Sequence, residues 1–271
     1  MSNLRLRILS ALVMAPAVLM LAWLGGLPFR LLVAATGFAI FYEWAHMARL
    51  DVRRIAWGAY VLLLAVPLVL MAAGTPADVI LVGLVPVLLA ARAVGSFAGH
   101  GAWGAAGIAY AAIPCIAFAA LRGSDAEGLA AIALLFAVVW ATDVFAYFVG
   151  RTLGGPRLAP AISPGKTWSG AVGGALFGVL AGAAAAVALG AVQWQMLALV
   201  SLGLSIASQC GDLFESWVKR RFGAKDSSGL IPGHGGVMDR VDGLVAAATA
   251  LYVVGWLMSG AAKPAGDLFA F

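Results

Sequence analysis

The chain has 271 residues, of which 63% are hydrophobic and only 11% are charged. Its mean hydropathy is +1.00, whereas a typical soluble domain is roughly 45–50% apolar and about 25% charged. This composition excludes a soluble enzyme, a disordered tail and a fibrous protein. Cys115 and Cys210 stand in apolar runs, with neither disulfide-framework nor metal-ligand spacing. The remaining class is an all-α, polytopic integral membrane protein.

Runs of about 20 mostly apolar residues are long enough to cross a bilayer as helices. The chain has about nine such runs, at roughly residues 8–25, 31–48, 56–73, 77–93, 102–121, 129–150, 170–191, 194–215 and 240–260. An alternative for the first run is a signal peptide, because Arg5 and Arg7 precede it, but no small-x-small cleavage site follows. We therefore expect about nine transmembrane helices.

The positions of lysine and arginine predict the orientation of these helices. With the N-terminus in the cytoplasm, only Arg30, Arg122 and Lys263 of the 17 lysines and arginines fall in outside segments. The pI of about 9.6 then reflects inner loops that face anionic lipid headgroups or an anionic substrate, and it does not indicate nucleic acid.

Polar residues are unevenly distributed along the chain. Residues 1–140 are expected to form about five transmembrane helices with few polar groups, and residues 141–271 a catalytic transmembrane region with cytoplasmic loops at 151–169 and 216–239. No inverted repeat of interrupted helices, which many transporters have, is present in the sequence. Glycines at every fourth position, from Gly170 to Gly182, predict close helix packing within or between chains.

Carboxylates gather at one predicted membrane depth, near the cytoplasmic ends of three helices. They are Asp143, Asp212, Glu215, Asp239 and Asp242. A single one of them is explained equally well by local pairing, such as Glu215 with Lys219 four residues later. Five together would repel one another without a cation, and Mg²⁺ binds one or two carboxylates together with water and substrate phosphate. We therefore predict a Mg²⁺ site, with a second cation as an option.

Two cytoplasmic loops contain candidate phosphate-binding residues. Lys166 and the hydroxyls of Ser163 and Thr167 are expected to contact phosphate, although a lysine at headgroup level is the alternative. The segment is not a P-loop, because Pro160 replaces the first glycine of that motif and no strand is expected before it. In the second loop, backbone N–H groups at Gly235 and Gly236 can bind an anion before a helix N-terminus.

The second loop, residues 216–242, combines cations, a glycine-rich turn and an acidic helix start. Such a combination suits phosphoryl or nucleotidyl transfer, which needs positioning and electrostatic stabilisation more than covalent chemistry. His234 either donates to phosphate or orders the loop, and the sequence does not decide between the two.

The stretch from Ser216 to Asp242 resembles the signature of the phosphatidate cytidylyltransferases, also called CDP-diacylglycerol synthases. It reads S-x-x-K-R, four residues, K-D, then P-G-H-G-G, two residues and D-R-x-D. Upstream, D-x-x-A-Y-x-x-G-R at 143–151 and S-P-x-K-T at 163–167 resemble two further elements of that family. The chain departs from the family at Gly165, where many members have a basic residue, and at Ser169, where many have an acid.

The resemblance implies an enzyme of phospholipid biosynthesis that converts CTP and phosphatidate to CDP-diacylglycerol and pyrophosphate. It implies metal ligands at Asp212 and Asp239, followed by Asp143 and Asp242. The expected catalytic residues are Asp212, Asp239, Lys219, Arg220, Lys225 and Arg240. The expected substrate-binding residues are Ser163, Lys166, Thr167, Asp226, His234, Gly235 and Gly236.

The expected setting is a bacterial inner membrane with the active site on the cytoplasmic side and a homodimer as an option. Two alternatives remain. One is an enzyme with the same cation and loop but another acceptor lipid, such as a polyprenol kinase. The other is an anion or metal transporter, which the gathering of ionisable groups at one face of the membrane disfavours.

Overall fold

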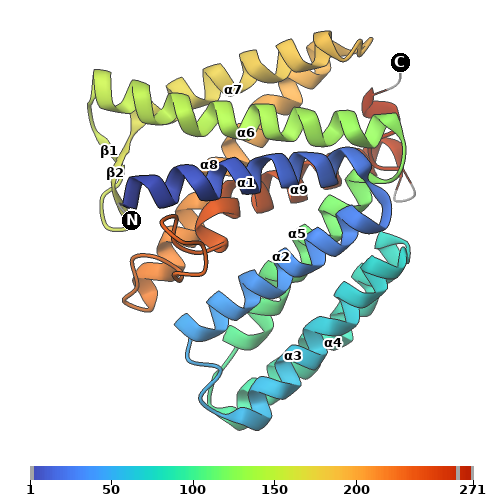
Figure 1. The fold of residues 1–271 in the computed structure, drawn as a ribbon, viewed down its shortest axis with the longest axis vertical. Coiled ribbons are helices and arrows are strands. Elements are labelled where there is room, and N and C mark those ends of the chain that lie inside the picture. The colour runs from blue at the N-terminus through green and yellow to red at the C-terminus, as the bar shows by residue number, and fades with distance from the viewer. Residues whose placement is uncertain (1–2, 261–262, 270–271) are drawn as a thin grey trace. The chain divides into compact units, whose positions relative to one another are not determined.

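The computed structural model describes residues 3–260 and 263–269, and helices dominate this part of the chain. The nine described α-helices are α1 (Asn3–Leu24), α2 (Gly26–Met47), α3 (Arg54–Ala73), α4 (Ala77–Ala98), α5 (Trp103–Arg122), α6 (Ala126–Leu153), α7 (Trp168–Ala188), α8 (Trp194–Arg221) and α9 (Met238–Ser259). Two short strands, β1 (Arg157–Ala159) and β2 (Ser163–Thr167), and a 3₁₀ helix η1 (Asp267–Phe269) complete it (Figure 1). The prediction of an all-α membrane protein is confirmed.

The nine helices coincide with the nine apolar runs of the sequence, but only some have the composition of a membrane span. Helices α3 to α9 are long and apolar enough to cross a bilayer. Helix α2 has the length, but Arg30 and Glu43 lower its hydropathy. The part of α1 whose side chains are described, Ser10–Leu24, is shorter; Arg5 and Arg7 lie outside it. Nine spans and a cytoplasmic N-terminus stay predictions.

The chain is divided into two compact units. The first consists of helices α1 to α5 up to Ala120 together with the segment Ala224–Arg240. The second consists of Leu121–Gly223 and the chain from Val241 onward, and it includes α6, the β1–β2 hairpin, α7, α8 and most of α9. The predicted division at residue 140 is one of function, which this packing does not test.

In the first unit, aromatic side chains fix the C-terminal half of α2. Trp44 is fully enclosed, and its Nε1 donates to the carbonyl of Trp103 at 3.0 Å. A Cβ at Gly107 of α5 would lie 2.5 Å from the Trp44 ring, so only glycine lets α5 approach this closely. Phe41 stacks on Trp57 of α3 with a centroid separation of 5.9 Å. These contacts hold the turn of α2 that carries Glu43.

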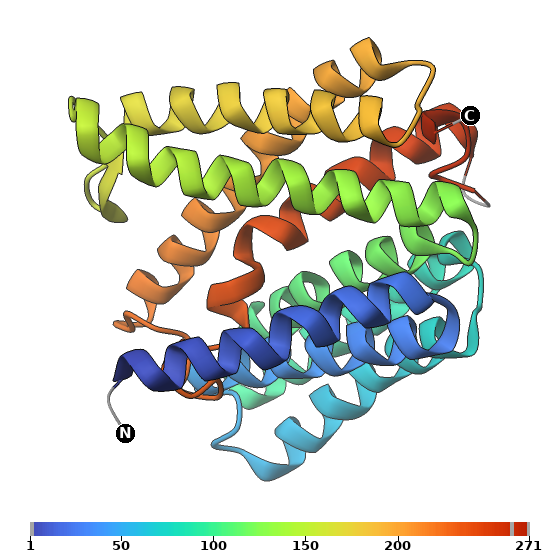
Figure 2. The ribbon, with the colours of Figure 1, turned by 45° about the horizontal axis from the view of Figure 1, so that its top comes forward.

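In the second unit, glycines let α6 and α7 lie side by side, as both views show (Figures 1 and 2). A Cβ at Gly174 would lie 2.8 Å from the Thr142 carbonyl oxygen, and one at Gly182 would lie 2.0 Å from Ser201 Oγ of α8. Thr142 Oγ1 donates to Ser205 Oγ at 2.8 Å in the same contact. The glycine row is therefore buried inside this unit. The predicted close packing is confirmed, and of the two alternatives, within or between chains, the structure shows packing within the chain.

Candidate functional site

The second unit brings four of the predicted site residues together. Lys166 Nζ of β2 forms an ion pair with Asp212 Oδ2 of α8. Asp143 of α6 and Asp242 of α9 each interact electrostatically with both Asp212 and Lys166. We call these four residues the Asp212 cluster. Four separate elements thus supply one charged side chain each, and all three acids interact electrostatically with the same lysine.

A close crossing of α8 and α9 explains why two of these carboxylates meet. A Cβ at Gly211 would lie 2.6 Å from the carbonyl oxygen of Asp242, and one at Gly243 would lie 2.4 Å from Ser208 Oγ. Each glycine is the neighbour of a cluster carboxylate in the sequence. Gly243 N also donates to Asp242 Oδ1 at 2.8 Å, which orients that side chain. The glycines therefore bring the backbones of α8 and α9 together where their acids stand.

The lysine of the cluster stands on a β-hairpin, which the sequence did not lead us to expect. Strand β2 pairs with β1 in antiparallel register, with Arg157 opposite Thr167. The prediction that no strand precedes Lys166 was wrong, although the conclusion that the segment is not a P-loop stands, because Lys166 lies in a strand. Arg220 Nε of α8 donates to the carbonyl of Ile162 at 3.3 Å, which ties the hairpin to the end of that helix.

The hydroxyl of Thr167 serves as a helix cap. It is buried, accepts the N–H of Gly170 at 3.1 Å and lies 3.0 Å from Ser169 Oγ. Ser169 Oγ in turn donates to the carbonyl of Gly154 at the end of α6. Capping satisfies one of the free N–H groups at the start of α7. Thr167 thus has a structural role as the N-cap of α7, whereas Lys166 and Ser163 of the same strand are partly exposed.

The donor set of the Asp212 cluster fits a hard divalent cation. Carboxylate oxygens are the ligands that Mg²⁺ prefers, and it needs only one or two of them, with water and substrate phosphate completing its shell. Within residues 3–260 and 263–269, no three or more His, Cys, Asp or Glu side chains are grouped closely enough to hold a metal alone. A site shared between protein and substrate is therefore the arrangement that the residues allow.

At the end of α8, Glu215 and Lys219 form the local pair that the sequence offered as an alternative. Their oxygen and nitrogen lie 2.6 Å apart, and the Glu215 side chain is completely buried. Removing either partner would leave a buried charge without its counterion, which is strongly unfavourable. Lys219 therefore has a structural partner, and a phosphate contact from it stays a prediction.

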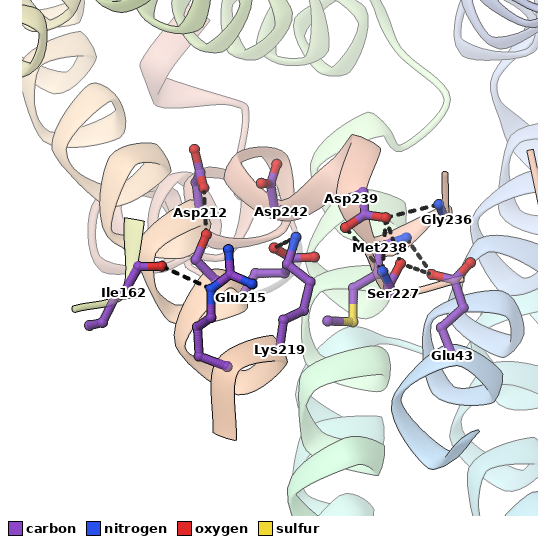
Figure 3. A network of polar contacts seen from close by, with 12 residues as sticks. Glu43, Ile162, Asp212, Glu215, Lys219, Ser227, Gly236, Met238, Asp239 and Asp242 are labelled. Carbon is purple, nitrogen blue, oxygen red and sulfur yellow. Dashed lines mark hydrogen bonds and ion pairs between the residues drawn. The ribbon is translucent and has the colours of Figure 1, made fainter. Parts of the chain in front are cut away.

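The first unit contains a second group of acids, which is built differently (Figure 3). Asp239, at the start of α9, folds back on the loop before it. Its Oδ2 accepts the N–H of Gly236 at 2.9 Å, the N–H of Ser227 at 3.0 Å and the hydroxyl of Ser227 at 3.0 Å. The carboxylate predicted as a first metal ligand therefore closes a loop of its own chain. We call residues 227–238 the anchored loop.

Glu43 reaches the same loop from α2. Its Oε1 accepts from Ser228 Oγ at 2.6 Å and from the N–H of Val237 at 2.8 Å. Its Oε2 accepts from Ser227 Oγ at 3.0 Å and from the N–H of Met238 at 2.7 Å. Because a hydroxyl has one proton, Ser227 can donate to Glu43 or to Asp239 at any moment but not to both.

Backbone N–H groups at the glycine-rich turn, which was predicted to bind an anion, already donate to carboxylates of the protein itself. The N–H groups of Gly236, Val237 and Met238, which precede or open α9, all donate to carboxylates of the protein. Gly236 cannot be larger, since a Cβ there would lie 1.9 Å from Ser227 Oγ and 2.7 Å from both Glu43 oxygens. These N–H groups stabilise the loop, and the expectation that Gly236 binds substrate through its N–H stays untested.

The other predicted loop residues have simpler surroundings. His234 Nδ1 lies 2.8 Å from Ser10 Oγ of α1, which is the loop-ordering arrangement. Gly235 has a φ of 86°, a conformation that favours glycine. The exposed charged side chains of residues 216–242 are Arg220, Arg221, Lys225, Asp226 and Arg240. They have the access to solvent that a substrate contact requires.

Glu43 is the residue that sequence reasoning missed. It stands in the apolar run 31–48, in the region judged to carry few polar groups, and its side chain is fully buried. An ionisable side chain inside a membrane-length run is costly and indicates a specific partner. That rule, applied to Glu43 by itself, would have identified it, although it would not have named the partner 194 residues away.

Comparison with known proteins gives a consistent result. Residues 5–258 match the sequence model of the cytidylyltransferase family. The phosphatidate cytidylyltransferase of Brucella suis is 43% identical over 274 residues, which cover 100% of both chains. That of Brucella abortus is 45% identical over 258 residues, or 94% of both chains. That of Bacillus subtilis is 43% identical over 136 residues, which cover 50% of this chain and 51% of the relative.

Proposed function

This chain belongs to the cytidylyltransferase family, and from that premise we propose that it converts CTP and phosphatidate to CDP-diacylglycerol and pyrophosphate. The observation that carries the proposal is the likeness to relatives of that activity over the full length of both chains. The cluster of one lysine and three aspartates adds chemical support, because nucleotidyl transfer depends on charge and positioning.

The reaction needs little covalent help from the protein. An oxygen of the phosphatidate phosphate forms a bond to the α-phosphorus of CTP, and the bond from that phosphorus to the bridging oxygen of pyrophosphate breaks. The attacking phosphate is already ionised at neutral pH, so no general base is required. We assign a phosphate contact to Lys166 of the Asp212 cluster. The exposed Lys225 and Arg240 of the first unit keep their predicted phosphate contacts as separate proposals. Lys219, Arg220, Ser163, Asp226 and His234 keep their predicted parts in catalysis or substrate binding as proposals to be tested.

We propose that Asp212, together with Asp143 or Asp242, would hold Mg²⁺. A bound Mg²⁺ neutralises triphosphate charge and polarises the phosphoryl oxygens. Lys166 is then the natural partner of a substrate phosphate, since it can exchange its contact with Asp212 for one with the anion. Asp239 is a weaker candidate for the metal than the sequence indicated, because its Oδ2 already accepts three hydrogen bonds from the loop.

The protein is an integral membrane protein, and we propose a bacterial inner membrane with the active site on the cytoplasmic side. The organisms of the relatives and the lysine and arginine distribution support this placement. Phosphatidate would enter sideways from the bilayer, with its headgroup at the level of the helix ends. A homodimer rests on family resemblance alone, since the glycine row is occupied within the chain.

The test is a transfer assay on the purified full chain in mixed micelles with α-labelled CTP, Mg²⁺ and phosphatidate. We expect label to move into the lipid phase, to depend on both Mg²⁺ and phosphatidate, and to be lost in Asp212→Asn. With γ-labelled CTP, which would reveal a lipid kinase, a polyprenol or diacylglycerol as the acceptor should give no labelled lipid. Transfer to one of those lipids and not to phosphatidate would overturn the assigned substrate. Full activity after removal of divalent cations would overturn the metal.

A further inference from the structure

We infer that Glu43 is a positioning residue for the transfer reaction, acting through the anchored loop and the first turn of α9. The inference rests on the proposed function and adds to it a residue outside the signature motifs. It is carried by one geometric fact. A fully buried carboxylate on α2 lies within hydrogen-bond distance of four donors of a loop that lies more than 180 residues later in the chain.

The arrangement requires a group that only accepts. Each Glu43 oxygen faces one serine hydroxyl and one backbone N–H, at distances from 2.6 to 3.0 Å. A hydroxyl can rotate to become an acceptor, but a backbone N–H cannot. A carboxylate presents two acceptor oxygens, whereas the amide of glutamine presents one acceptor and one donor. Glutamine at this position would therefore set its NH₂ against the N–H of Val237 or of Met238.

The position of these donors explains why the acid is stable there. Val237 and Met238 stand at the beginning of α9, where free N–H groups and the helix dipole favour a negative charge. A helix N-terminus is ordinarily capped by a side chain next to it in the sequence. Here Glu43 of α2 supplies the negative charge instead. Because the Glu43 side chain is fully buried, a substrate phosphate cannot replace it at these N–H groups. Its hydrogen bonds to the loop are therefore structural.

The loop carries residues that the reaction is proposed to use. Met238, whose N–H donates to Glu43, is followed directly by Asp239 and Arg240. The N–H of Gly236 and that of Ser227 donate to Asp239, so Glu43 and Asp239 hold the same short stretch of chain from two sides. A change at Glu43 thus moves the start of α9 and, with it, the Arg240 guanidinium proposed to meet phosphate. The same change at Glu43 also alters the surroundings of Lys225, which lies two residues before Ser227.

The experiment compares Glu43→Gln with Glu43→Asp and with the control Asp51→Asn in the full chain. Glutamine has nearly the same shape but lacks one acceptor, whereas aspartate is shorter but still only accepts. Asp51 is another acid near the end of α2, which pairs with His46 and does not contact the loop. Two measurements are made on each: kcat and KM for CTP and phosphatidate, and the rate of tryptic cleavage after the exposed Lys225. Cleavage after Arg49, in the turn that follows α2, serves as the internal reference.

We expect Glu43→Gln to lower kcat by about 10- to 100-fold, the range found for residues that orient functional groups, with little change in KM. Cleavage after Lys225 should accelerate while cleavage after Arg49 does not. Glu43→Asp should recover part of the kcat, and Asp51→Asn should behave as the unmodified protein does.

Unchanged kcat and unchanged cleavage in Glu43→Gln would overturn the inference while leaving the proposed function standing. Acceleration of both cleavages together would also overturn it, because that result indicates general unfolding. If the unmodified chain transfers no nucleotide, the proposed function fails, yet the cleavage experiment still reports on the anchor. Should Glu43→Gln not fold, Ser228→Ala removes one donor to Glu43 and carries the same prediction at smaller size.

Discussion

Two groups of acids in this molecule have the same chemical groups but different surroundings. In the anchored loop of the first unit, Glu43 and Asp239 are surrounded by backbone N–H and serine donors at hydrogen-bond distance. In the Asp212 cluster of the second unit, the acids face one another and a lysine, and about a third of the Asp212 side chain is exposed. The negative charge of the first group is stabilised by N–H and hydroxyl dipoles of the protein. The second group has three acids to one lysine, so its negative charge exceeds its positive charge and favours a cation.

The number of hydrogen-bond donors around a carboxylate separates the structural from the functional acids in this chain. A carboxylate already surrounded by two backbone N–H donors and one or two serine hydroxyls gains little from a metal ion. One held among other acids by close helix crossing is destabilised until a cation or a phosphate-bound metal arrives. We therefore expect substitutions in the Asp212 cluster to affect turnover with little change in stability. Substitutions that disturb the hydrogen bonds between the anchored loop and its two carboxylates should affect both.

The largest effect is expected for Asp212→Asn. We expect kcat to fall by about 10²- to 10³-fold, the size found when one electrostatic contact to a transition state is removed. The melting temperature should hardly change, because a partly exposed ion pair contributes little to stability. Glu127→Gln, an acid in the first turn of α6 outside both groups, is the matched control. A large fall in melting temperature for Asp212→Asn would remove the distinction between the two groups.

Gly236→Ala should have the next largest effect and should act on both properties. The added methyl would displace Ser227 Oγ and the Glu43 carboxylate, so we expect a loss of about 1–3 kcal/mol in unfolding free energy. Displacement of the start of α9 should lower kcat by roughly 10²-fold. Gly229→Ala, in the same loop with open space around it, is the control and should be neutral. Thermal unfolding in detergent and the transfer assay measure the two effects, and equal behaviour of the two variants contradicts the anchoring.

Gly211→Ala tests whether the close crossing of α8 and α9 positions the carboxylates of the Asp212 cluster. A methyl there would press on the Asp242 carbonyl and on Ala246 at 2.6 Å, separating α8 from α9. We expect about a tenfold fall in kcat, smaller than for the loss of the Asp212 charge itself, because a shift of under 1 Å is involved. Gly203→Ala, two turns earlier on α8 with nothing within 4 Å, should be active. Activity of Gly211→Ala at the level of Gly203→Ala contradicts a cluster set by this crossing.

Ser228→Ala should have the smallest effect of the series. It removes one of four donors to Glu43, at 2.6 Å, and leaves both backbone N–H donors in place. We expect kcat to fall roughly two- to fivefold, which corresponds to about 0.5–1 kcal/mol. Progress curves at saturating CTP measure it. A loss as large as that from Glu43→Gln would mean that the hydroxyl, and not the backbone, supports the carboxylate.

The sequence alone predicted the helices and most of the Asp212 cluster, for a plain physical reason. Membrane helices are apolar runs of fixed length, and acids at their ends stand out against that background. Periodicity and spacing also brought Asp143, Asp212 and Asp242 to one depth. What the sequence could not predict was Lys166 on a hairpin, because a strand of five residues with proline and glycine has no strand signal.

The parts that the sequence missed depend on contacts between distant segments. Gly235 and Gly236 were read as a cradle for a foreign anion, and the geometry of that cradle is present. Its occupant comes from residue 43, which no local pattern connects to residue 237. In the same way, the ridge from Gly170 to Gly182 indicated close packing but not its partner, and the structure identifies that partner as α6 and α8.

The long separation between Glu43 and its donors bears on how the protein is made. A ribosome completes α2 long before it reaches the anchored loop, 194 residues downstream of Glu43 at Val237. Until then α2 carries an acid with none of its four donors, together with Arg30, and ionisable side chains in a membrane-length helix are costly to keep in lipid. Glu43 therefore gains its donors only after the loop has been synthesised, so this buried charge is satisfied late in the making of the chain.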